Sequence, residues 1–541
     1  MTTHKVILFL LALLVWQFET VTAYSSNHGE FLPRAPVGAD DEYTCSKTKR
    51  CKIGCCGPLD KTTDTGNCGY GLDFCGKACS ADCNRKSECD PGWGREWSVA
   101  SHCPLNVCCS KFGFCGTTSS FCGDVKVLSP ECNGKSAQGR TIGYYEGWNL
   151  GHACGKMTPE QIPLGYYTHL NFAFAYIDPH TFHIAPMDNN TASLYRAVTR
   201  LKRKQPNLQV WIAIGGWAMN DPGPTQFTFS DLAASQAAQD AFFESLLSFM
   251  KTNDFDGVDL DWEYPVSEDH GGRPADFANF VTLLKRLREH LSQSGRRYGI
   301  SMTLPASYWY LRGFDIINLE AHVDFFNMMT YDIHGTWDRT NHDDPYKAYA
   351  HTNLTEINRA LELLWRNNIN PARVNLGLGF YGRSFTMKDP QCMAPGCQFT
   401  TGGRPGECTT TTGVLSNTEI QKVLNANATG THVTLYKEDA VKVLTWDKVQ
   451  WLSYDDTETL KLKLELANRR CLGGTMVWAV DLDADGMLIE ALGSAMGKRK
   501  AQVWDIGEIY SLLIPEWGTE DVDDVLGWKK KHHDQQQALM G

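Results

Sequence analysis

Eight β-rich runs, separated by segments with helical patterns, constrain the fold more than any other feature of this chain. They lie between residues 140 and 495 and read TIGYYEGW, THLNFAFAYI, QVWIAIGGW, DGVDLDWEY, YGISMTLPAS, VDFFNMMTYDI, VNLGLGFYGRSF and GGTMVWAVDL. Several are almost entirely apolar, which is typical of parallel strands buried on both faces. In the segment 276–291, apolar residues recur at three- and four-residue steps, which predicts an amphipathic helix. Eight strand–helix units predict an α/β fold of the (β/α)8 TIM-barrel type.

A doubly wound open sheet is the alternative fold for such alternation. Sheets of that kind usually carry a glycine-rich phosphate-binding loop after the first strand. The sequence after the first β-rich run has no such loop. With 541 residues the chain is also longer than one ordinary domain, so further domains are expected outside the barrel.

Residues 1–23 have the pattern of a secretory signal peptide. A basic start precedes an apolar run from Val6 to Trp16, and small residues at 21–23 form a cleavage site. This run is shorter than the roughly 20 residues that span a bilayer, and an amphipathic first helix is the alternative. Residues 24–44 form a polar linker. The sequence therefore predicts a secreted, extracellular protein, and it leaves association with a cell wall open.

Residues 45–132 hold 15 of the 20 cysteines, which predicts a disulfide framework outside the cell. A zinc site is the alternative, but CxxC pairs are absent and histidines do not cluster there. The run CPLNVCCSKFGFCGTTSSFCG, from Cys103 to Gly123, repeats an earlier, looser arrangement of cysteines that begins at Cys51. We therefore expect two small disulfide-rich modules, at 45–88 and 89–132, and no bound metal.

Three carboxyl groups share one face of the run DGVDLDWEYP at residues 256–265. Because strand side chains alternate, Asp259, Asp261 and Glu263 point to the same side. Like charges and partial burial raise at least one pKa, which keeps one carboxyl group protonated near neutral pH, as a general acid requires. Barrel sites lie at the C-terminal ends of strands, so Glu263 is the predicted catalytic acid. A solvated strand end or a calcium site is the alternative, which the apolar residues between the acids oppose.

The order Asp-x-x-Asp-x-Asp-x-Glu, filled by Asp256, Asp259, Asp261 and Glu263, resembles the signature of glycoside hydrolase family 18. The resemblance covers residues 140–495. It implies a (β/α)8 barrel with a small α+β insertion at 386–446, which cleaves β-1,4 bonds between N-acetylglucosamine units with retention. It also implies that the substrate's own N-acetyl group is the nucleophile. Glu263 would be acid and then base, Asp261 would orient the acetamide, and Asp259 would share charge or a proton with Asp261.

Other runs resemble the substrate site of the same family. By this resemblance Tyr331 would assist catalysis by a hydrogen bond to the acetamide oxygen, and Trp478 would stack on the distorted sugar. The remaining candidates for substrate binding are Asp332, Met329, Trp217, Tyr381 and Arg383. For each aromatic residue alone, a role in the core is the alternative.

The run AIGG departs from the family at one position. The family usually has a serine where this chain has Ala213. The serine hydroxyl normally helps the two aspartates hold charge. The departure therefore predicts an altered activity or pH profile rather than an inactive enzyme.

The second cysteine repeat resembles hevein-type chitin-binding modules, with the binding positions filled by Ser110, Phe112, Phe114 and Phe121. A purely structural knot is the alternative. The resemblance implies these bridges: Cys89–Cys109, Cys103–Cys115, Cys108–Cys122, Cys45–Cys56, Cys51–Cys68, Cys55–Cys75 and Cys79–Cys83. It leaves Cys132, Cys154, Cys392, Cys397, Cys408 and Cys471 without assigned partners. The first repeat has no aromatic residue between Cys56 and Cys68, so we expect it to be structural only.

A hevein-type module followed by this barrel resembles fungal chitinases of the killer-toxin-like subgroup. The predicted protein is a monomeric chitinase without a cofactor, whose partners are chitin and chitin oligosaccharides. Endo action is the favoured mode, and exo action is the alternative that the sequence leaves open. The net charge of −11 opposes nucleic-acid binding, and no later segment predicts contact with a membrane. Two other functions stay open, an endo-β-N-acetylglucosaminidase acting on N-glycans and a non-catalytic chitin-binding lectin. Residues 498–541 form a tail to which we assign no role.

Overall fold

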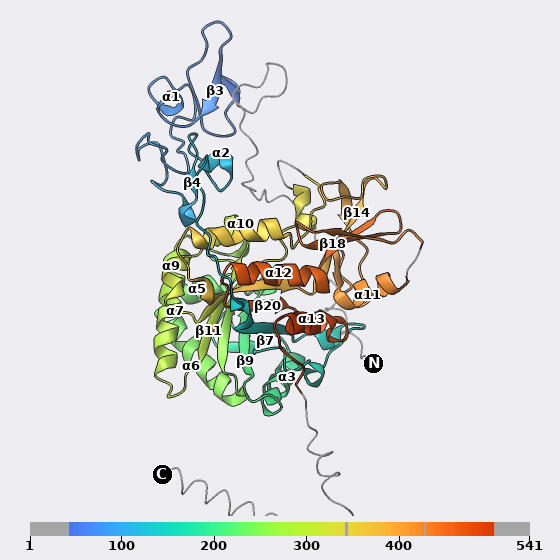
Figure 1. Cartoon of the computed structure of the whole chain (residues 1–541). Helices are drawn as coiled ribbons and strands as arrows, with labels where there is room; N and C mark the ends of the chain where they lie inside the picture. The colour runs from blue at the N-terminus through green and yellow to red at the C-terminus, as the bar shows by residue number, and fades with distance from the viewer. Residues whose placement is uncertain (1–42, 341–344, 427–428, 502–541) are drawn as a thin grey trace, which may run out of the picture. The chain divides into compact units, whose positions relative to one another are not determined.

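The computed structural model describes residues 43–340, 345–426 and 429–501, so the expected signal peptide and nearly all of the linker and the tail lie outside the described residues. Eight parallel strands close into a barrel (Figure 1). They are β6 (Arg140–Glu146), β7 (His169–Ile177), β9 (Gln209–Gly215), β10 (Gly257–Asp261), β11 (Gly299–Pro305), β12 (Phe325–Met329), β13 (Val374–Gly379) and β20 (Gly474–Trp478). β6 pairs with both β20 and β7, which closes the ring and confirms the predicted TIM barrel.

Helices cover the outside of the barrel. They include α3 (Asn189–Thr199), α5 (Thr228–Ala234), α6 (Gln236–Asn253), α7 (Asp276–Ser292), α9 (Ile316–Glu320), α10 (Leu354–Trp365), α12 (Thr457–Arg469) and α13 (Met487–Ala495). Figure 1 shows α5, α6 and α7 side by side along one flank, where they pack on one another. Among the described residues, no helix combines the length and apolar character needed to cross a membrane.

Helix α7 shows how the predicted periodicity produces packing. Phe280, Leu284, Leu287 and Leu291 are buried, as their spacing on one helix face requires. Phe277 belongs to the same pattern in the sequence, but its side chain is 41% exposed. One member of the apolar stripe therefore lies at its edge, outside the core.

Strand β10 separates its two faces by alternation. Trp262 follows the strand on the helix side, where its ring stacks on Phe229 of α5 and meets Phe280 of α7 edge to face. Asp259 and Asp261 have the opposite parity and point into the barrel, where both are buried. The packing of Trp262 thus fixes the direction in which the acids point.

The seventh β-rich run contains two strands, not one. Strand β13 belongs to the barrel, and after Phe380 the chain starts β14 (Tyr381–Met387) of a second sheet. That sheet also contains β15 (Phe399–Gly402), β16 (Val414–Ser416), β17 (His432–Tyr436), β18 (Val441–Trp446) and β19 (Gln450–Tyr454), and α11 (Asn417–Ala426) packs on it. This lobe is α+β as expected, but its sheet runs from 381 to 454 and so extends beyond the expected range of 386–446.

The cysteine-rich region repeats one small design. The first copy has β1 (Thr44–Ser46), β2 (Cys55–Cys56), β3 (Thr65–Gly69) and the single turn α1 (Leu72–Cys75), and the second has β4 (Cys108–Cys109), β5 (Cys115–Gly116) and α2 (Ser119–Cys122). The seven disulfides expected from the resemblance are all present in the structure.

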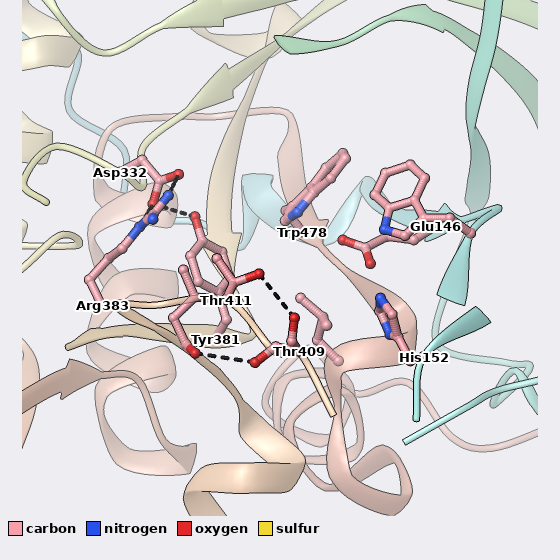
Figure 2. A pocket seen from close by; sticks show the side chains of 11 residues that line it. Glu146, His152, Asp332, Tyr381, Arg383, Thr409, Thr411 and Trp478 are labelled. Carbon is pink, nitrogen blue, oxygen red and sulfur yellow. Dashed lines mark hydrogen bonds and ion pairs between the residues drawn. The ribbon is translucent and has the colours of Figure 1, made fainter. Parts of the chain in front are cut away.

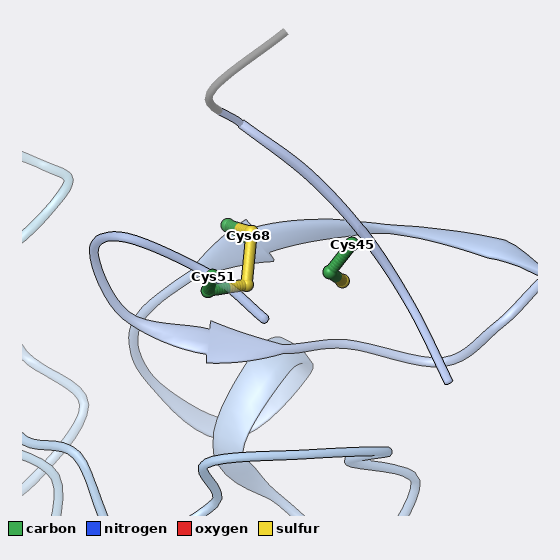
Figure 3. A group of neighbouring side chains, drawn as sticks. All are labelled: Cys45, Cys51 and Cys68. Carbon is green, nitrogen blue, oxygen red and sulfur yellow. A yellow bond between two sulfur atoms is a disulfide. The ribbon is translucent and has the colours of Figure 1, made fainter. Parts of the chain in front are cut away.

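Buried cysteines form the centre of the first copy. Figure 3 shows Cys45, Cys51 and Cys68 close together, with the bond between Cys51 and Cys68. Their sulfur atoms lie within 4.8 Å of one another, a spacing that could suit a metal ion. Each of them is disulfide-bonded, however, so no thiolate is available as a ligand.

The six cysteines left without partners form three further disulfides. Cys392–Cys397 closes a short loop within the lobe. Cys132–Cys471 joins the segment after the second module to the turn before β20. Cys154–Cys408 joins the loop after β6 to the lobe. The last bridge ties together two segments that both contribute to the candidate site.

Candidate active site

Asp259 lies deepest in the row of acids and is surrounded by hydrogen-bond donors. The Tyr144 hydroxyl donates to Oδ2 at 2.5 Å, and the Ser301 hydroxyl and Asn327 Nδ2 donate to Oδ1 at 2.5 and 3.1 Å. Burial raises the pKa of this carboxyl group, and these donors oppose the shift. The residue is fully buried, so it can act on the substrate only through its neighbours.

The structure accounts for the alanine at 213. Asp259 pairs in register with Ala213 on β9 and with Ser301 on β11. A hydroxyl absent from one neighbouring strand is therefore present on the other. The prediction of altered pKa tuning stays a prediction, but Asp259 does not lack a hydroxyl donor.

Asp261 is the middle member of the row. Its Oδ1 accepts a hydrogen bond of 2.5 Å from the Thr303 hydroxyl on β11. Burial first, and then the charges of Glu263 and Asp259, raise its pKa well above the usual value. The Asp261 carboxyl group therefore holds a proton readily, and its protonation depends on the charges of Asp259 and Glu263.

Glu263 follows β10 at the C-terminal end of the barrel and is half-buried. Burial raises its pKa to about 7, although hydrogen bonds from the Tyr264 side chain and the Trp217 backbone N–H act to lower it. A carboxyl group with this pKa is protonated in a large fraction of molecules near neutral pH, and it can both give and take a proton. Part of the residue remains exposed at this end of the barrel.

Asp332, just after β12, has the opposite electrostatic environment. Its Oδ1 accepts hydrogen bonds from the Tyr381 hydroxyl at 2.6 Å and from Arg383 Nε at 2.8 Å, and its Oδ2 accepts one from Arg383 Nη2 at 2.5 Å (Figure 2). Burial acts to raise the pKa of Asp332, but Arg383 and His351 overcome it and hold the pKa far below its usual value. Asp332 is therefore a fixed carboxylate.

Aromatic rings gather around Trp478, which is half-buried. Its ring stacks on Phe174 with centroids 5.7 Å apart and lies 5.4 Å from Tyr144 and 6.3 Å from Trp148. Tyr144 thus touches both Trp478 and Asp259. A sugar stacked on Trp478 would lie close to the row of acids.

The other predicted residues lie at neighbouring strand ends. Met329 ends β12 and is half-buried, and Tyr331 directs its hydroxyl to Met476 Sδ at 3.6 Å while its ring meets Tyr381. Trp217, after β9, is 48% exposed and contacts His270 edge to face at 4.3 Å. An exposed indole at a barrel rim is available to a ligand.

A pocket with a volume of about 190 Å³ opens beside Trp478 (Figure 2). It brings together four predicted residues, Asp332, Tyr381, Arg383 and Trp478. Seven other lining residues were not predicted: Glu146, Trp148, His152, Thr409, Thr411, Val414 and Leu482. Glu263 and Asp261 do not line this pocket, but Tyr144 connects it with the row of acids, because its ring lies against Trp478 and its hydroxyl donates to Asp259.

Part of what was missed could have been found in the sequence. In TIGYYEGW, Tyr144 and Glu146 have the same parity, so alternation already places both on one face of the first strand. The threonines at 409 and 411 gave no such signal. They lie in an irregular segment of the lobe and reach the pocket through tertiary structure alone.

The predicted chitin-binding residues of the second module differ in exposure. Phe112 is 43% exposed, and the Lys111 ammonium lies 5.0 Å from its ring. Ser110 is buried and accepts a hydrogen bond from the Phe114 backbone N–H at 3.2 Å. Phe121 is half-buried. The structure therefore presents Phe112 most openly.

The first repeat contributes an aromatic ring that was not predicted. Tyr70 meets Phe114 edge to face, with centroids 5.5 Å apart. It follows the pair Cys68-Gly69, just beyond the segment that lacks aromatic residues. The first repeat thus contacts the aromatic set of the second.

Comparisons with known proteins agree with this architecture. The "Secreted chitinase LysM12" of Penicillium expansum is 30% identical over 424 residues, which cover 70% of this chain and 27% of that protein. The "Killer toxin subunits alpha/beta" of Kluyveromyces lactis are also 30% identical over 424 residues, which cover 74% of this chain and 35% of that protein. The chain thus spans about a third or less of the length of these relatives, which fit the predicted killer-toxin-like subgroup.

A solved structure shares the barrel. The Group IV chitinase of Ostrinia furnacalis, crystallised in complex with allosamidin, superposes with a TM-score of 0.60 at 26% identity. The match covers 66% of this chain and 97% of that one. Residues 94–133 match the family described as chitin recognition protein, and residues 140–483 match glycosyl hydrolases family 18. Because the second match runs from β6 to the segment after β20, the chain belongs to glycosyl hydrolase family 18.

Proposed function

We propose that this glycoside hydrolase is a chitinase that cleaves β-1,4 bonds between N-acetylglucosamine units by a retaining, substrate-assisted mechanism. One observation carries the proposal. A row of carboxyl groups ends at a half-buried Glu263 whose pKa is about 7. Such a group can protonate a leaving oxygen near neutral pH.

The geometry supports the following sequence of steps. Glu263 gives its proton to the glycosidic oxygen as the bond from that oxygen to the anomeric carbon breaks. The acetamide oxygen of the same sugar attacks the anomeric carbon and forms an oxazolinium ion, which the Asp261 carboxylate stabilises through the acetamide N–H. Water then attacks the anomeric carbon as the bond from that carbon to the acetamide oxygen breaks, which restores the acetamide, and Glu263 takes up a proton from the water. Asp259 supports this cycle by sharing charge with Asp261.

The positions of the side chains support the roles that we assign in substrate binding. Trp478 provides an apolar face for the sugar beside the row of acids. Tyr331 donates a hydrogen bond from its hydroxyl to the acetamide oxygen. Asp332 is held by Tyr381 and Arg383 as a carboxylate that accepts hydrogen bonds from sugar hydroxyls. Met329 at the end of β12 and Trp217 after β9 are the remaining residues that we assign to substrate binding.

The module at 89–132 is proposed to hold the enzyme on insoluble chitin. Its match to chitin recognition proteins supports this role, and Phe112 is its most exposed candidate. We further propose that the protein acts outside the cell as an endo-acting monomer. Its ten disulfides and the relative named a secreted chitinase support an extracellular site.

A product time course on soluble chitin oligomers tests the proposal, with the wild type, Glu263→Gln and the matched control Glu268→Gln. Glu268 is an exposed acid shortly after the same strand. We expect Glu263→Gln to lose about 10²–10⁴-fold in kcat, and Glu268→Gln to retain full activity. The first products should keep the β-anomeric configuration. Equal rates for all three proteins would remove Glu263 from the mechanism.

The two other functions predict different results in the same assay. An endo-β-N-acetylglucosaminidase would release N-glycans from a glycoprotein faster than it cleaves chitin oligomers. A lectin would bind oligomers without cleaving them at any enzyme concentration. The chitin-recognition module and the presence of Glu263 favour the chitinase.

A further inference from the structure

One member of a second pair of buried carboxyl groups, Glu146, lines the pocket on the side away from Asp332 (Figure 2). Glu146 is the last residue of β6, and Asp481 follows the neighbouring strand β20. Their side chains are only 5% and 3% exposed. The Glu146 backbone N–H donates to Asp481 Oδ1 at 3.0 Å, which fixes the two residues side by side.

No cation of the described chain offsets this pair. Neither carboxyl group forms a salt bridge with any residue that the structure describes, whereas Asp332 in the same pocket is held by Arg383. Two adjacent carboxylates without a partner would repel each other in a site of low dielectric constant. One of them must therefore carry a proton, or a ligand must supply a donor.

The hydrogen-bond pattern locates that proton. Asp481 Oδ2 is buried, and no N–H or O–H group of the described residues donates to it. A carboxylate oxygen in this state is satisfied if the neighbouring carboxyl group is protonated and donates. Burial and the charge of Asp481 also raise the pKa of Glu146 well above its usual value, and burial raises that of Asp481 to about 7 although its hydrogen bonds with Glu146 act to lower it.

The other titratable groups nearby do not replace this proton. Burial lowers the pKa of His152, in the loop after β6, so its ring is neutral at neutral pH. Asp483 accepts hydrogen bonds from the backbone N–H groups of Leu488 and Ile489 instead. Burial raises the phenol pKa values of the two neighbouring tyrosines, Tyr145 and Tyr167, so both stay neutral.

The carboxyl group of Glu146 points into the pocket, between Trp478 and His152 (Figure 2). We propose that Glu146 and Asp481 share one proton, and that Glu146 accepts a hydrogen bond from a hydroxyl or amide N–H of the sugar next to the one on Trp478. Glu146 is then a specificity-determining residue for a neutral N-acetylated sugar. The inference rests on the proposed function for the identity of the sugar.

The sharing of one proton suits a neutral ligand. A single proton keeps one negative charge distributed over the pair, which strengthens the hydrogen bond accepted from the sugar. Loss of the last proton would leave two adjacent buried charges, and the local structure of the subsite would be strained by their repulsion. Asp481 titrates at about 7 and leaves the last proton on Glu146, whose pKa lies well above its usual value, so binding should weaken only as the pH rises further and that proton is lost.

The test measures oligomer binding in the Glu263→Gln background, so that turnover and the titration of Glu263 do not contribute. Calorimetry with a chitin tetramer compares this parent with added Glu146→Ala, Glu146→Gln or Asp481→Asn. Glu160→Gln is the control, because it is an exposed acid in the loop after the same strand. Melting temperatures are recorded for all variants to detect misfolding.

We expect Glu146→Ala to weaken binding about tenfold, as loss of a hydrogen bond to a charged group would. Glu146→Gln keeps an acceptor and a donor and should bind within about threefold of the parent. Affinity of the parent should fall above pH 7, as the pair loses its last proton. Both Glu146→Gln and Asp481→Asn should remove that fall, because each variant keeps only one carboxyl group and no second charge can repel it. The control should not differ from the parent.

Unchanged affinity and pH dependence in a folded Glu146→Ala protein would overturn the inference, because the pair would then be structural only. An unfolded Glu146→Ala protein still leaves Glu146→Gln, whose pH profile alone decides between the two results. Failure of the proposed function gives a different result. In that case the wild type cleaves no oligomer, whatever residue 146 is.

Discussion

The barrel and the cysteine-rich region differ in the kind of residue that they bury. In the barrel, Asp259 and Asp261 lie at 0% and 2% exposure among apolar strands, and burial shifts their pKa values. In the small modules the buried residues are largely cysteines, and the candidate binding residue Phe112 lies at the surface. Small modules cannot bury enough apolar surface for a core of their own. The barrel can therefore shift the pKa values of its carboxyl groups by burial, whereas the modules can contact a ligand only through the shape and the apolar side chains of their surface.

Asp261→Asn should produce the largest difference between the two regions, because it should affect hydrolysis by the barrel and not chitin binding by the module. It removes the carboxylate to which we assign stabilisation of the oxazolinium ion, so kcat on soluble oligomers should fall about 10²–10³-fold. Retention on insoluble chitin, which we assign to the module, should not change. Steady-state kinetics and a pull-down on chitin beads measure the two effects.

Asp256→Asn is the matched control, since Asp256 belongs to the same signature but points the other way. Its carboxyl group pairs with Lys202 at 3.0 Å and with Arg296, and it accepts the Val210 backbone N–H at 2.9 Å. This variant should lose about 1.5–3 kcal/mol of stability and keep most of its kcat. Similar kinetics for the two variants would contradict the assignment of roles by strand parity.

The alternation of side chains along one strand could be predicted from the sequence, but contacts between different strands could not. Alternation placed Asp259, Asp261 and Glu263 on one face, and the structure shows Asp259 and Asp261 inside the barrel with Glu263 half-buried at its rim. The donors to these acids could not be predicted in the same way. Ser301 and Tyr144 come from other strands, so their relation to Asp259 depends on register across the barrel.

The fold was predicted more completely than the pocket. Several barrel strands are almost entirely apolar runs, so their burial could be predicted from the local sequence alone. The seventh run predicts one strand, whereas the structure has two, because only Phe380, a buried apolar residue, separates β13 from β14. Thr409 reaches the pocket from a loop, next to the Cys154–Cys408 bridge. Such long-range contacts leave no periodic signal.

Removal of the Cys51–Cys68 disulfide should lower the stability of the first module and leave that of the barrel unchanged. The bridge closes a loop with a sequence separation of 17, so Cys51→Ser with Cys68→Ser should destabilise the first module by about 3 kcal/mol, or about 150-fold in its unfolding equilibrium. Hydrolysis of soluble oligomers should not change. Calorimetry of the full chain should show a new transition at low temperature.

Cys392→Ser with Cys397→Ser provides the comparison within the barrel's lobe. That bridge closes a loop with a sequence separation of only 5, so its loss should cost about 2 kcal/mol. The lobe also has a core around Phe385, Phe399 and Trp451 to hold it. A larger loss there than in the first module would show that the modules depend on their disulfides no more than the barrel does.

The pH dependence should also differ between the two regions. Glu263 must be protonated to act as an acid, and its raised pKa of about 7 preserves the proton up to that pH. Above it, kcat/KM on soluble oligomers should fall about tenfold per pH unit. Binding of the module to chitin should stay level over the same range, because Ser110 and the three phenylalanines do not titrate. A parallel fall in both would assign the effect to unfolding instead.

The smallest expected effect is that of Phe112→Ala. Its ring is exposed at the surface of the module, so loss of one stacking contact should weaken retention on insoluble chitin about threefold to tenfold. Hydrolysis of soluble oligomers should be unchanged, because these substrates reach the barrel without the module. Val99→Ala is the control, since Val99 is an apolar residue of the same module that is 75% exposed. Equal retention by both variants would mean that the module holds chitin through residues other than Phe112, and Tyr70 beside Phe114 would be the next to test.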